Sequence, residues 1–283
     1  MSLSEDLYQM YKDKVNNMLV RMDKIIMTKV SDSKEFLIEY VNQWNHYTIF
    51  IYSLNKVMQY LDRFHLKNQG DLSLTETALN LFREKIFRGR LLDLRKATLN
   101  EILKDREGQL IEKELIKSAV QHFIYMGYEH KVTIAKKGGA TDFDWLGEKN
   151  LMTYDAEFQK YLLQDTEHYY KNMASKWFKT VSCYEYVLNV HKNLTKEESN
   201  ADFWLQDQTK PMVVKIVLDE AIVAYAPQIV EMNQGCSVMF NERKPEELKL
   251  IYEVFLRVDK TLTYIIKKME PFIIAEGEKI VLN

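Results

Sequence analysis

The sequence predicts an all-α protein built from helical bundles that stack one after another. The chain has 283 residues, of which only 9 are Gly and 4 are Pro. The first proline is Pro211, whereas an all-β or α/β chain needs turn residues far more often. Apolar residues also recur at steps of three and four over long segments, which is typical of amphipathic helices.

Capping residues and glycines predict where the helices begin and end. Three serines stand three residues before a glutamate, in the form of a capping box: Ser2, Ser73 and Ser182. Asp32 or Ser33 can cap another helix, and Thr209 a further one with Pro211 in its first turn. Stop signals are expected at Gly70, Gly89, Gly108, Gly127 and Gly235. These signals predict about ten helices, at residues 3–29, 33–65, 74–89, 91–106, 110–126, 151–179, 182–206, 210–234, 245–258 and 259–275.

Two of these segments carry an apolar stripe that we expect to be buried. In the helix over 33–65 the stripe consists of Phe36, Tyr40, Trp44, Tyr47, Ile51, Leu54, Met58 and Leu61. In the helix over 151–179 it consists of Tyr154, Phe158, Leu162, Tyr169, Met173 and Trp177. Residues 128–150 lack helical periodicity and contain Gly138-Gly139, so we expect an ordinary loop there, with Trp145 as a packing anchor.

The order of long and short helices predicts a repeat of five helices, two shorter ones followed by three long ones. On this basis residues 1–90 hold the last three helices of one unit. Residues 91–236 form a complete unit, and residues 237–283 begin a third. Such units bury their apolar faces against their neighbours, as solenoids do, so we expect an elongated molecule.

Composition gives no indication of chemistry on nucleic acid or at a membrane. The net charge is -2 and the pI is about 6.3, so no electrostatic attraction to DNA, RNA or anionic lipid is expected. No apolar run approaches the roughly 18–20 residues of a membrane span. Cys183 and Cys236 make neither a disulfide framework nor a metal site, which favours a reducing intracellular location, cytoplasmic or nuclear.

The search for catalytic motifs also finds nothing. Nucleotide-binding glycine loops, HExxH and CxxC are all absent. The six histidines are scattered and none is at metal-ligand spacing from another, so we expect surface or helix-flank residues: His46, His65, His122, His130, His168 and His191. We therefore expect no enzyme activity, no cofactor and no metal, and a scaffold that binds proteins.

Several passages resemble the amino-terminal repeats of the cullin family, in the family's order. In "FLIEYVNQWNHYTIFIYSLNKVMQYLDRF" the family pattern is carried by Trp44, Tyr47 and Tyr60-Leu61-Asp62-Arg63. The segment "FREKIFRGRL" (82–91) is similar to a helix end in the family. "ILKDREGQLIEKELIKSAVQHFIYMGYE" (102–129) and "YDAEFQKYLLQDTEHYYKNMASKWF" (154–178) are similar to later helices. The resemblance spans essentially the whole chain and is nearest to the cullin of Skp/F-box-type ubiquitin ligases.

The resemblance implies a stalk of five-helix cullin repeats in a multisubunit RING-type ubiquitin ligase. In that role the chain spaces an adaptor and substrate receptor from the RING protein and its ubiquitin-conjugating partner, without bond chemistry of its own. The expected adaptors are Skp-type or BTB proteins with an F-box or other substrate receptor. The RING protein is expected on a carboxy-terminal cullin region that these 283 residues do not include, and the chain resembles a repeat from its third helix onward. It is either a stalk segment or a truncated relative.

In the family the adaptor also contacts the fifth helix of the first repeat, which corresponds here to residues 74–89. The resemblance makes Leu72, Thr75, Glu76 and Leu79 the candidate adaptor-binding residues. Leu72 and Thr75 depart from the aromatic residues usual in the family, and Leu79 could instead face the core. The alternative to a cullin is another helical-rod scaffold, such as a subunit of a vesicle-tethering complex. An all-α enzyme is the further alternative.

Overall fold

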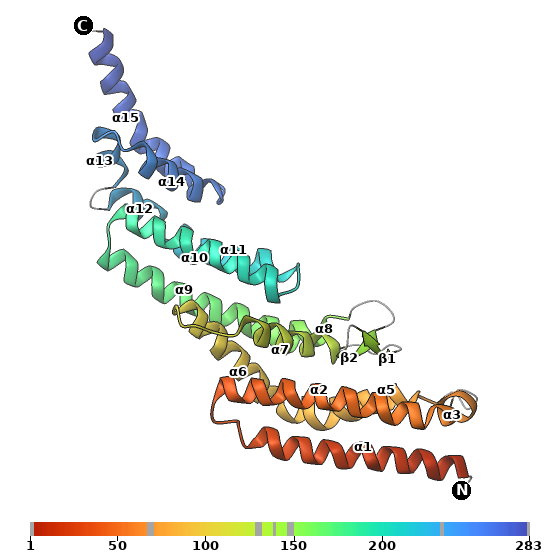
Figure 1. Ribbon diagram of the computed structural model, residues 1–283. Coiled ribbons are helices and arrows are strands. Elements are labelled where there is room, and N and C mark those ends of the chain that lie inside the picture. Colours follow the sequence, from red (N-terminus) through yellow and green to blue (C-terminus); the bar gives the residue numbers. More distant parts are fainter. Residues whose placement is uncertain are drawn as a thin grey trace. The chain divides into compact units, whose positions relative to one another are not determined.

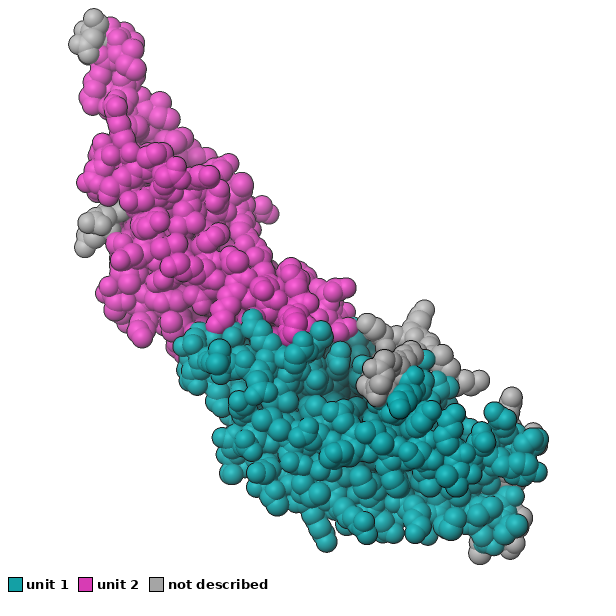
Figure 2. Space-filling model, in the orientation of Figure 1, with its two compact units in different colours: residues 1–159 teal, residues 160–283 magenta. Residues whose placement is uncertain are grey.

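The computed structural model describes residues 3–66, 71–127, 132–137, 140–145, 150–232 and 235–281. These residues are helical apart from one two-stranded sheet and short connections, so the predicted all-α class is confirmed. The chain divides into two compact units, unit 1 at residues 1–159 and unit 2 at residues 160–283 (Figure 2).

Unit 1 is a helical bundle with a β-hairpin (Figure 1). Its elements are α1 (Leu3–Met27), α2 (Ser33–Val57), α3 (Gln59–Leu61), the π-helical turn η1 (Asp62–Leu66), α5 (Leu74–Phe82), the π-helical turn η2 (Arg83–Phe87), α6 (Arg88–Arg106), α7 (Lys113–Tyr125), β1 (Val132–Lys137), β2 (Ala140–Trp145), α8 (Met152–Tyr154) and the π-helical turn η3 (Asp155–Gln159). Helix α2 is the centre of this unit, since it packs against α1, α5, α6, α7 and the hairpin.

The predicted stripe on α2 forms much of the unit 1 core. Its first five members are buried: Phe36, Tyr40, Trp44, Tyr47 and Ile51. The ring of Phe82 on α5 lies 4.7 Å from that of Trp44 and 5.2 Å from that of Tyr47. The Tyr47 hydroxyl also donates a 2.6 Å hydrogen bond to the Ala78 carbonyl, which fixes α2 against α5.

Unit 2 begins with the long helices α9 and α10, continues through shorter ones and ends with the long helix α15. They are α9 (Lys160–Thr180), α10 (Cys183–Trp204), α11 (Thr209–Ala221), the 3₁₀ turn η4 (Val223–Tyr225), α12 (Ala226–Glu231), α13 (Cys236–Asn241), α14 (Pro245–Leu256) and α15 (Leu262–Val281). Helix α11 packs against both α9 and α10, and α10 also contacts α14. The predicted stripe included Tyr169, but Tyr169 is only partly buried. Its neighbour Tyr170 lies in the core instead.

The prediction of one unbroken helix over 33–65 is wrong at Met58. Helix α2 ends at Val57, because Met58 leaves the helical region at φ -100 and ψ 15. The turn that follows carries Leu61 and Leu66 into the core, and the Asp62 carboxylate accepts a 2.9 Å hydrogen bond from the Leu74 amide. Tertiary contacts of this kind override the helical preference of the segment.

The prediction that Gly89 ends a helix is also wrong. Elements α5, η2 and α6 follow one another without a break from Leu74 to Arg106, and Gly89 lies inside α6. One exposed glycine costs a helix only about 1 kcal/mol. That cost is offset by burial of Phe87 and Leu94 on either side. Gly108, in contrast, has φ +82 just after α6, as the predicted stop requires.

The predicted helix over 210–234 is divided into α11, η4 and α12. Ile222 departs from helical geometry at φ -113 and ψ -58, and α12 then begins with Pro227 in its first turn. Proline has no N–H to bond the preceding turn, so a new helix start is favoured there. Thr209 is the first helical residue of α11 and not its cap, which is Gln208.

The loop predicted over 128–150 contains an antiparallel hairpin of β1 and β2. Ile134 pairs with Phe143, and the Phe143 ring lies 5.3 Å from the ring of Trp44 on α2. Apolar residues alternate along each strand, which is the period of a strand. Trp145 was predicted to be a packing anchor. Its side chain is not among those that the structure describes, so this stays a prediction.

The remaining helix starts agree with the capping residues. Ser73 and Ser182 each form the predicted capping box, and the Asp32 carboxylate accepts a 2.9 Å hydrogen bond from the Glu35 amide. The predicted signals at Ser2 and Gly70 lie outside the described residues.

Candidate partner-docking surface

A network of hydrogen bonds fixes α1, α2 and α5 at one end of unit 1. The Tyr11 hydroxyl on α1 donates to the Asn55 side-chain oxygen at 2.9 Å and to the Leu74 carbonyl at 2.7 Å. The Asn55 amide donates to the Thr75 hydroxyl at 2.9 Å. Burial raises the pKa of Tyr11 well above its usual range, with nearby Asp62 adding to the effect, so the phenol stays protonated as a donor.

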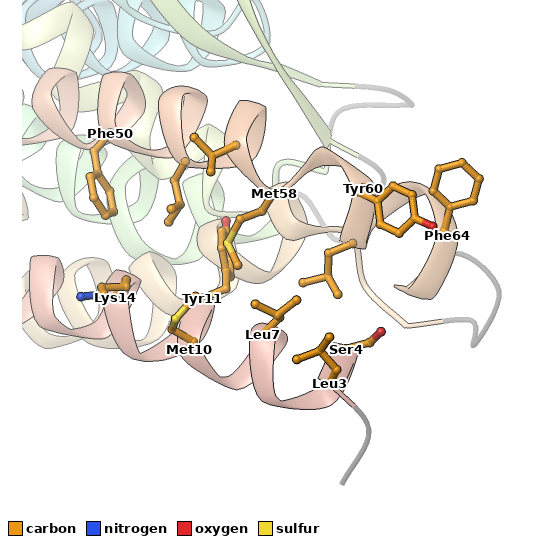
Figure 3. Close-up of a pocket in the computed structure, with 13 residues that line it drawn as sticks. Leu3, Ser4, Leu7, Met10, Tyr11, Lys14, Phe50, Met58, Tyr60 and Phe64 are labelled. Carbon is orange, nitrogen blue, oxygen red and sulfur yellow. The ribbon is translucent and has the colours of Figure 1, made fainter.

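An apolar groove of about 690 Å³ opens beside this network, between α1 and the segment from the end of α2 to η1 (Figure 3). We name it the α1–α2 groove. It is lined by Leu3, Ser4, Leu7, Met10, Tyr11, Lys14, Phe50, Leu54, Val57, Met58, Tyr60, Leu61 and Phe64. Most of these side chains are apolar, and Lys14 is the charged member of the lining.

Large apolar side chains at the groove are open to solvent. Leu3 is 77% exposed, Val57 82% and Tyr60 72%. The ring centroids of Tyr60 and Phe64 lie 4.5 Å apart beside the groove, with the ring planes tilted by 35°. Contiguous exposed apolar surface of this kind marks binding sites for other molecules, because leaving it in water is unfavourable.

The four predicted adaptor-binding residues lie together around the start of α5 but differ in accessibility. Leu72 is exposed, and Glu76 is partly exposed while its carboxylate completes the capping box with Ser73. Thr75 is buried in the hydrogen-bond network, and Leu79 is buried in the core at 2% exposure. Leu72 and Glu76 are therefore accessible to solvent and Thr75 and Leu79 are not, and the adaptor-binding role of all four stays a prediction.

The sequence interpretation missed the residues of the groove itself. Leu3, Leu7 and Met10 recur at steps of four and three on α1, beside the buried stripe that includes Tyr11 and Val15. A second apolar stripe next to the first was the signal that could have found the groove. Likewise the α2 stripe changes role along its length, since Leu54 and Met58 line the groove while its earlier members form the core.

His122 on α7 is not the surface or flank residue that we predicted. It is buried, its ring lies 4.7 Å from that of Trp44, and its Nδ1 lies 2.8 Å from the Ser118 carbonyl oxygen. Burial lowers its pKa to about 4, against the weaker opposing effect of the Ser118 hydrogen bond.

Within the described part of the chain, His, Cys, Asp and Glu form no group of three or more that could hold a metal ion. None of the described helices is long and apolar enough to cross a bilayer.

Comparison with known proteins gives consistent matches. The family described as "Cullin alpha solenoid domain" matches residues 1–283. "Putative cullin-like protein 1" of Arabidopsis thaliana is 25% identical over 98% of this chain and 36% of its own length. "Cullin-3" of Dictyostelium discoideum is 25% identical over 98% of this chain and 34% of its own. "Cullin-1" of Oryza sativa subsp. japonica is 24% identical over 98% and 35%. The chain thus spans about a third of the length of these relatives.

The helical bundles and the matching family place the chain in the α-solenoid class. Within that class the chain belongs to the cullin family, which matches its whole length. The sequence-based resemblance is therefore confirmed at the level of the family. Similar identities to relatives named Cullin-1 and Cullin-3 do not separate one cullin type from another.

Proposed function

We propose that this chain is a scaffold segment of a cullin-RING ubiquitin ligase. The observation that carries the proposal is the match of the cullin family to residues 1–283. In this role it holds an adaptor with its substrate receptor at a distance from the RING protein and the ubiquitin-conjugating enzyme. Family membership does not favour the alternative of a vesicle-tethering subunit. A cytoplasmic or nuclear location goes with this proposal.

A scaffold of this kind contributes to catalysis by positioning alone. Holding two reactants in one assembly converts their encounter into an intramolecular step at a raised effective concentration. The benefit depends on a stiff connection, and close-packed helices resist deformation. Within each unit the ring contacts and buried tyrosine hydrogen bonds support this stiffness, as with Tyr47 to Ala78 in unit 1 and Tyr186 to Ala221 in unit 2.

We propose that the chain is organised as cullin repeats at residues 1–90, 91–236 and 237–283. The two buried tyrosine contacts support this division. Tyr47 and Tyr186 lie on the fourth helix of their proposed repeats, and each donates a 2.6 Å hydrogen bond to an alanine carbonyl on the fifth. Tyrosines on the third helices also bond to the fourth, with Tyr11 bonded to Asn55 and Tyr170 to Glu197. The first proposed boundary falls within the continuous run of α5, η2 and α6.

We propose that the adaptor, a Skp-type or BTB protein, docks on the α1–α2 groove and on neighbouring Leu72 and Glu76. Leu72 lies two residues before α5, and the Leu74 amide and carbonyl bond to Asp62 and Tyr11, so the groove and the start of α5 form one region. An apolar centre with few charges is the usual composition of the buried part of a protein interface. The RING protein would bind elsewhere in the full-length ligase.

The proposal is tested by purifying the tagged full-length gene product from its own cells and identifying the proteins that copurify. We expect a Skp-type or BTB adaptor together with a RING-finger protein, and ubiquitin-chain synthesis when activating and conjugating enzymes are added. Copurification of vesicle-tethering subunits without adaptor, RING protein or ubiquitin transfer would contradict it.

A further inference from the structure

Two methionines line the α1–α2 groove, one from each wall. Met10 lies on α1, and Met58 lies where α2 ends. Figure 3 shows both side chains at the groove with their sulfur atoms. Met10 is 46% exposed, and Met58 is partly exposed. Small molecules that enter the groove therefore reach both thioethers.

Hydrogen bonds close to each methionine hold it at the groove. The hydroxyl of Tyr11 donates to the Asn55 side-chain oxygen at 2.9 Å, which sets the rotation of α1 about its axis. Met10 precedes Tyr11 and lies about 100° away around the helix, on the side of the groove. The Met58 amide donates to the Leu54 carbonyl at 3.0 Å. Both side chains therefore start from fixed backbone positions.

Exposure alone does not distinguish these two methionines. Met27, Met152 and Met212 are 47%, 75% and 44% exposed, and they lie outside the groove lining. Oxidation of a thioether needs access to the sulfur atom and no prior loss of a proton, so the exposed methionines share this reactivity. The consequences differ, because Met10 and Met58 are the methionines among the described residues that line the groove.

Oxidation changes the chemical character of the groove lining. Methionine is a flexible apolar side chain that adapts to irregular apolar partners, whereas its sulfoxide is polar. The other lining residues include Leu7, Leu54 and Val57, so the surface that fits the groove is apolar. A sulfoxide covered by such a surface loses its water without gaining a hydrogen-bond donor, which is unfavourable. The oxidised groove therefore binds an apolar partner less tightly than the reduced groove.

We propose that Met10 and Met58 form a redox modification site, at which a hydroperoxide converts both thioethers to sulfoxides and makes the groove too polar for its apolar partner. In the proposed function, on which this inference rests, that partner is the adaptor. At each methionine the sulfur lone pair attacks the hydroxyl oxygen of the peroxide, the S–O bond forms and the O–O bond breaks. The departing oxygen takes up the proton of the transferred oxygen and leaves as water or an alcohol. Each sulfur is oxidised by two electrons and one peroxide is reduced.

The modification is reversible, and a neighbouring lysine favours the oxidised groove. Sulfoxide reductases, one for each sulfoxide epimer, return the thioether and release water while a dithiol is oxidised to a disulfide. Lys14 lies four residues after Met10 on the same face of α1 and also lines the groove. Its ammonium is placed to donate a hydrogen bond to a sulfoxide on Met10, which would keep the polar group within the groove.

The first test maps oxidation along the purified chain. After hydrogen peroxide treatment, peptide mass spectrometry measures the gain of about 16 Da at each methionine. We expect Met10 to react within about threefold of the rate of Met27, and the buried Met22 and Met239 to react at least about tenfold more slowly. Met10 and Met58 as unreactive as Met22 would overturn the proposal.

The second test is calorimetric titration of a Skp-type or BTB adaptor into the full-length gene product, before peroxide treatment and after it with the peroxide removed. In the wild type we expect the affinity to fall about tenfold or more, and to return after treatment with both sulfoxide reductases.

Variants assign this loss to the groove, and the readout is the ratio of affinities before and after oxidation within each protein. In the double variant Met10→Leu/Met58→Leu, which forms no sulfoxide at the groove, the ratio should stay within about twofold. Met27→Leu is the matched control and should keep the wild-type loss. An equal loss in the double variant, or no loss in the wild type, would overturn the proposal.

An apolar dye separates this inference from the proposed adaptor docking. Anilinonaphthalene sulfonate binds exposed apolar surface. Peroxide should lower its fluorescence with the wild-type chain by about a third or more, and by clearly less with the double variant. If the reduced protein binds no adaptor, the proposed function is contradicted and the dye decides the redox site. Equal loss of fluorescence in both proteins, or no loss in the wild type, would overturn it.

Discussion

At the scale of single residues, His122 is a buried ionisable group in the aromatic core of unit 1. Its ring lies between those of Tyr40 at 5.1 Å and Trp44 at 4.7 Å. Its Nε2 has no hydrogen-bond partner among the described residues, while Nδ1 faces the Ser118 carbonyl. A proton added to this ring would place a charge in an apolar core, which is why burial lowers the pKa.

We predict that unit 1 loses stability as the pH falls below about 6.5. In the unfolded chain His122 then binds a proton, whereas in the folded chain its pKa of about 4 keeps it neutral. The contribution of neutral His122 to the free energy of unfolding is fully present above pH 6.5. It is lost progressively toward pH 4, and the total loss is about 3 kcal/mol. Urea unfolding of His122→Phe at several pH values should show a flatter pH dependence than the wild type.

The matched control is His168→Phe, which changes an exposed imidazole on α9. It should leave the pH dependence of unit 1 unchanged. An equal flattening in both variants, or no flattening in His122→Phe, would contradict the role of His122.

Residue-scale prediction from sequence worked where periodicity alone decides burial. Phe36, Tyr40 and Trp44 were predicted to be buried and are. His122 was misjudged because a single polar residue inside an apolar run does not reveal its neighbours, which come from α2 and lie about 80 positions earlier.

At the scale of elements, two glycines near the ends of α6 have opposite roles. Gly89 lies inside the helix, and a Cβ there would meet nothing within 4 Å. Gly108 follows the helix at φ +82, a conformation that other residues adopt only with strain. The same residue type therefore weakens the helix at one end and terminates it at the other.

We predict that Gly89→Ala stabilises unit 1 by about 0.5–1 kcal/mol, because alanine lowers the entropy of the unfolded chain and fits the helix. Gly108→Ala serves as the matched control and should destabilise it by about 1 kcal/mol or more. Both are measured as free energies of unfolding in urea. Destabilisation by Gly89→Ala would show that the continuous helix through residue 89 is incorrect.

Elements were predictable when their signals were local. The capping boxes at Ser73 and Ser182 marked helix starts correctly, since all their partners lie within one turn. The interruption at Met58 was not predictable in this way, because the turn after it is held by contacts with distant residues, such as the hydrogen bond that the Leu74 amide donates to Asp62. The hairpin around Phe143 was missed because two short alternating strands give a weak signal beside an aromatic helix.

At the scale of the whole molecule, the proposed division into cullin repeats predicts an elongated chain. Compact packing of 283 residues into one sphere-like domain would give a radius of gyration of roughly 19 Å. We predict a clearly larger value from small-angle X-ray scattering of the chain, with an extended distance distribution. A radius near 19 Å would contradict the predicted elongated arrangement.

The candidate site was only partly predictable from sequence. The resemblance selected residues around the start of α5, where Leu72 and Glu76 are accessible, while Leu79 lies in the core, which was the open alternative for it. The α1–α2 groove depends on how α1 meets the end of α2 in space, and no short sequence motif records that meeting. Partner surfaces made by several elements are harder to predict than single-helix stripes for this reason.

The most direct test of the central claim is calorimetric titration of a Skp-type or BTB adaptor into the full-length gene product. We predict binding that Val57→Glu weakens by about tenfold or more, because a charge enters the apolar groove. Leu92→Glu, which changes a 68% exposed leucine of α6 outside the groove, should change affinity less than about twofold. Absence of adaptor binding by the wild type, or equal affinity of both variants when both remain folded, would contradict the account.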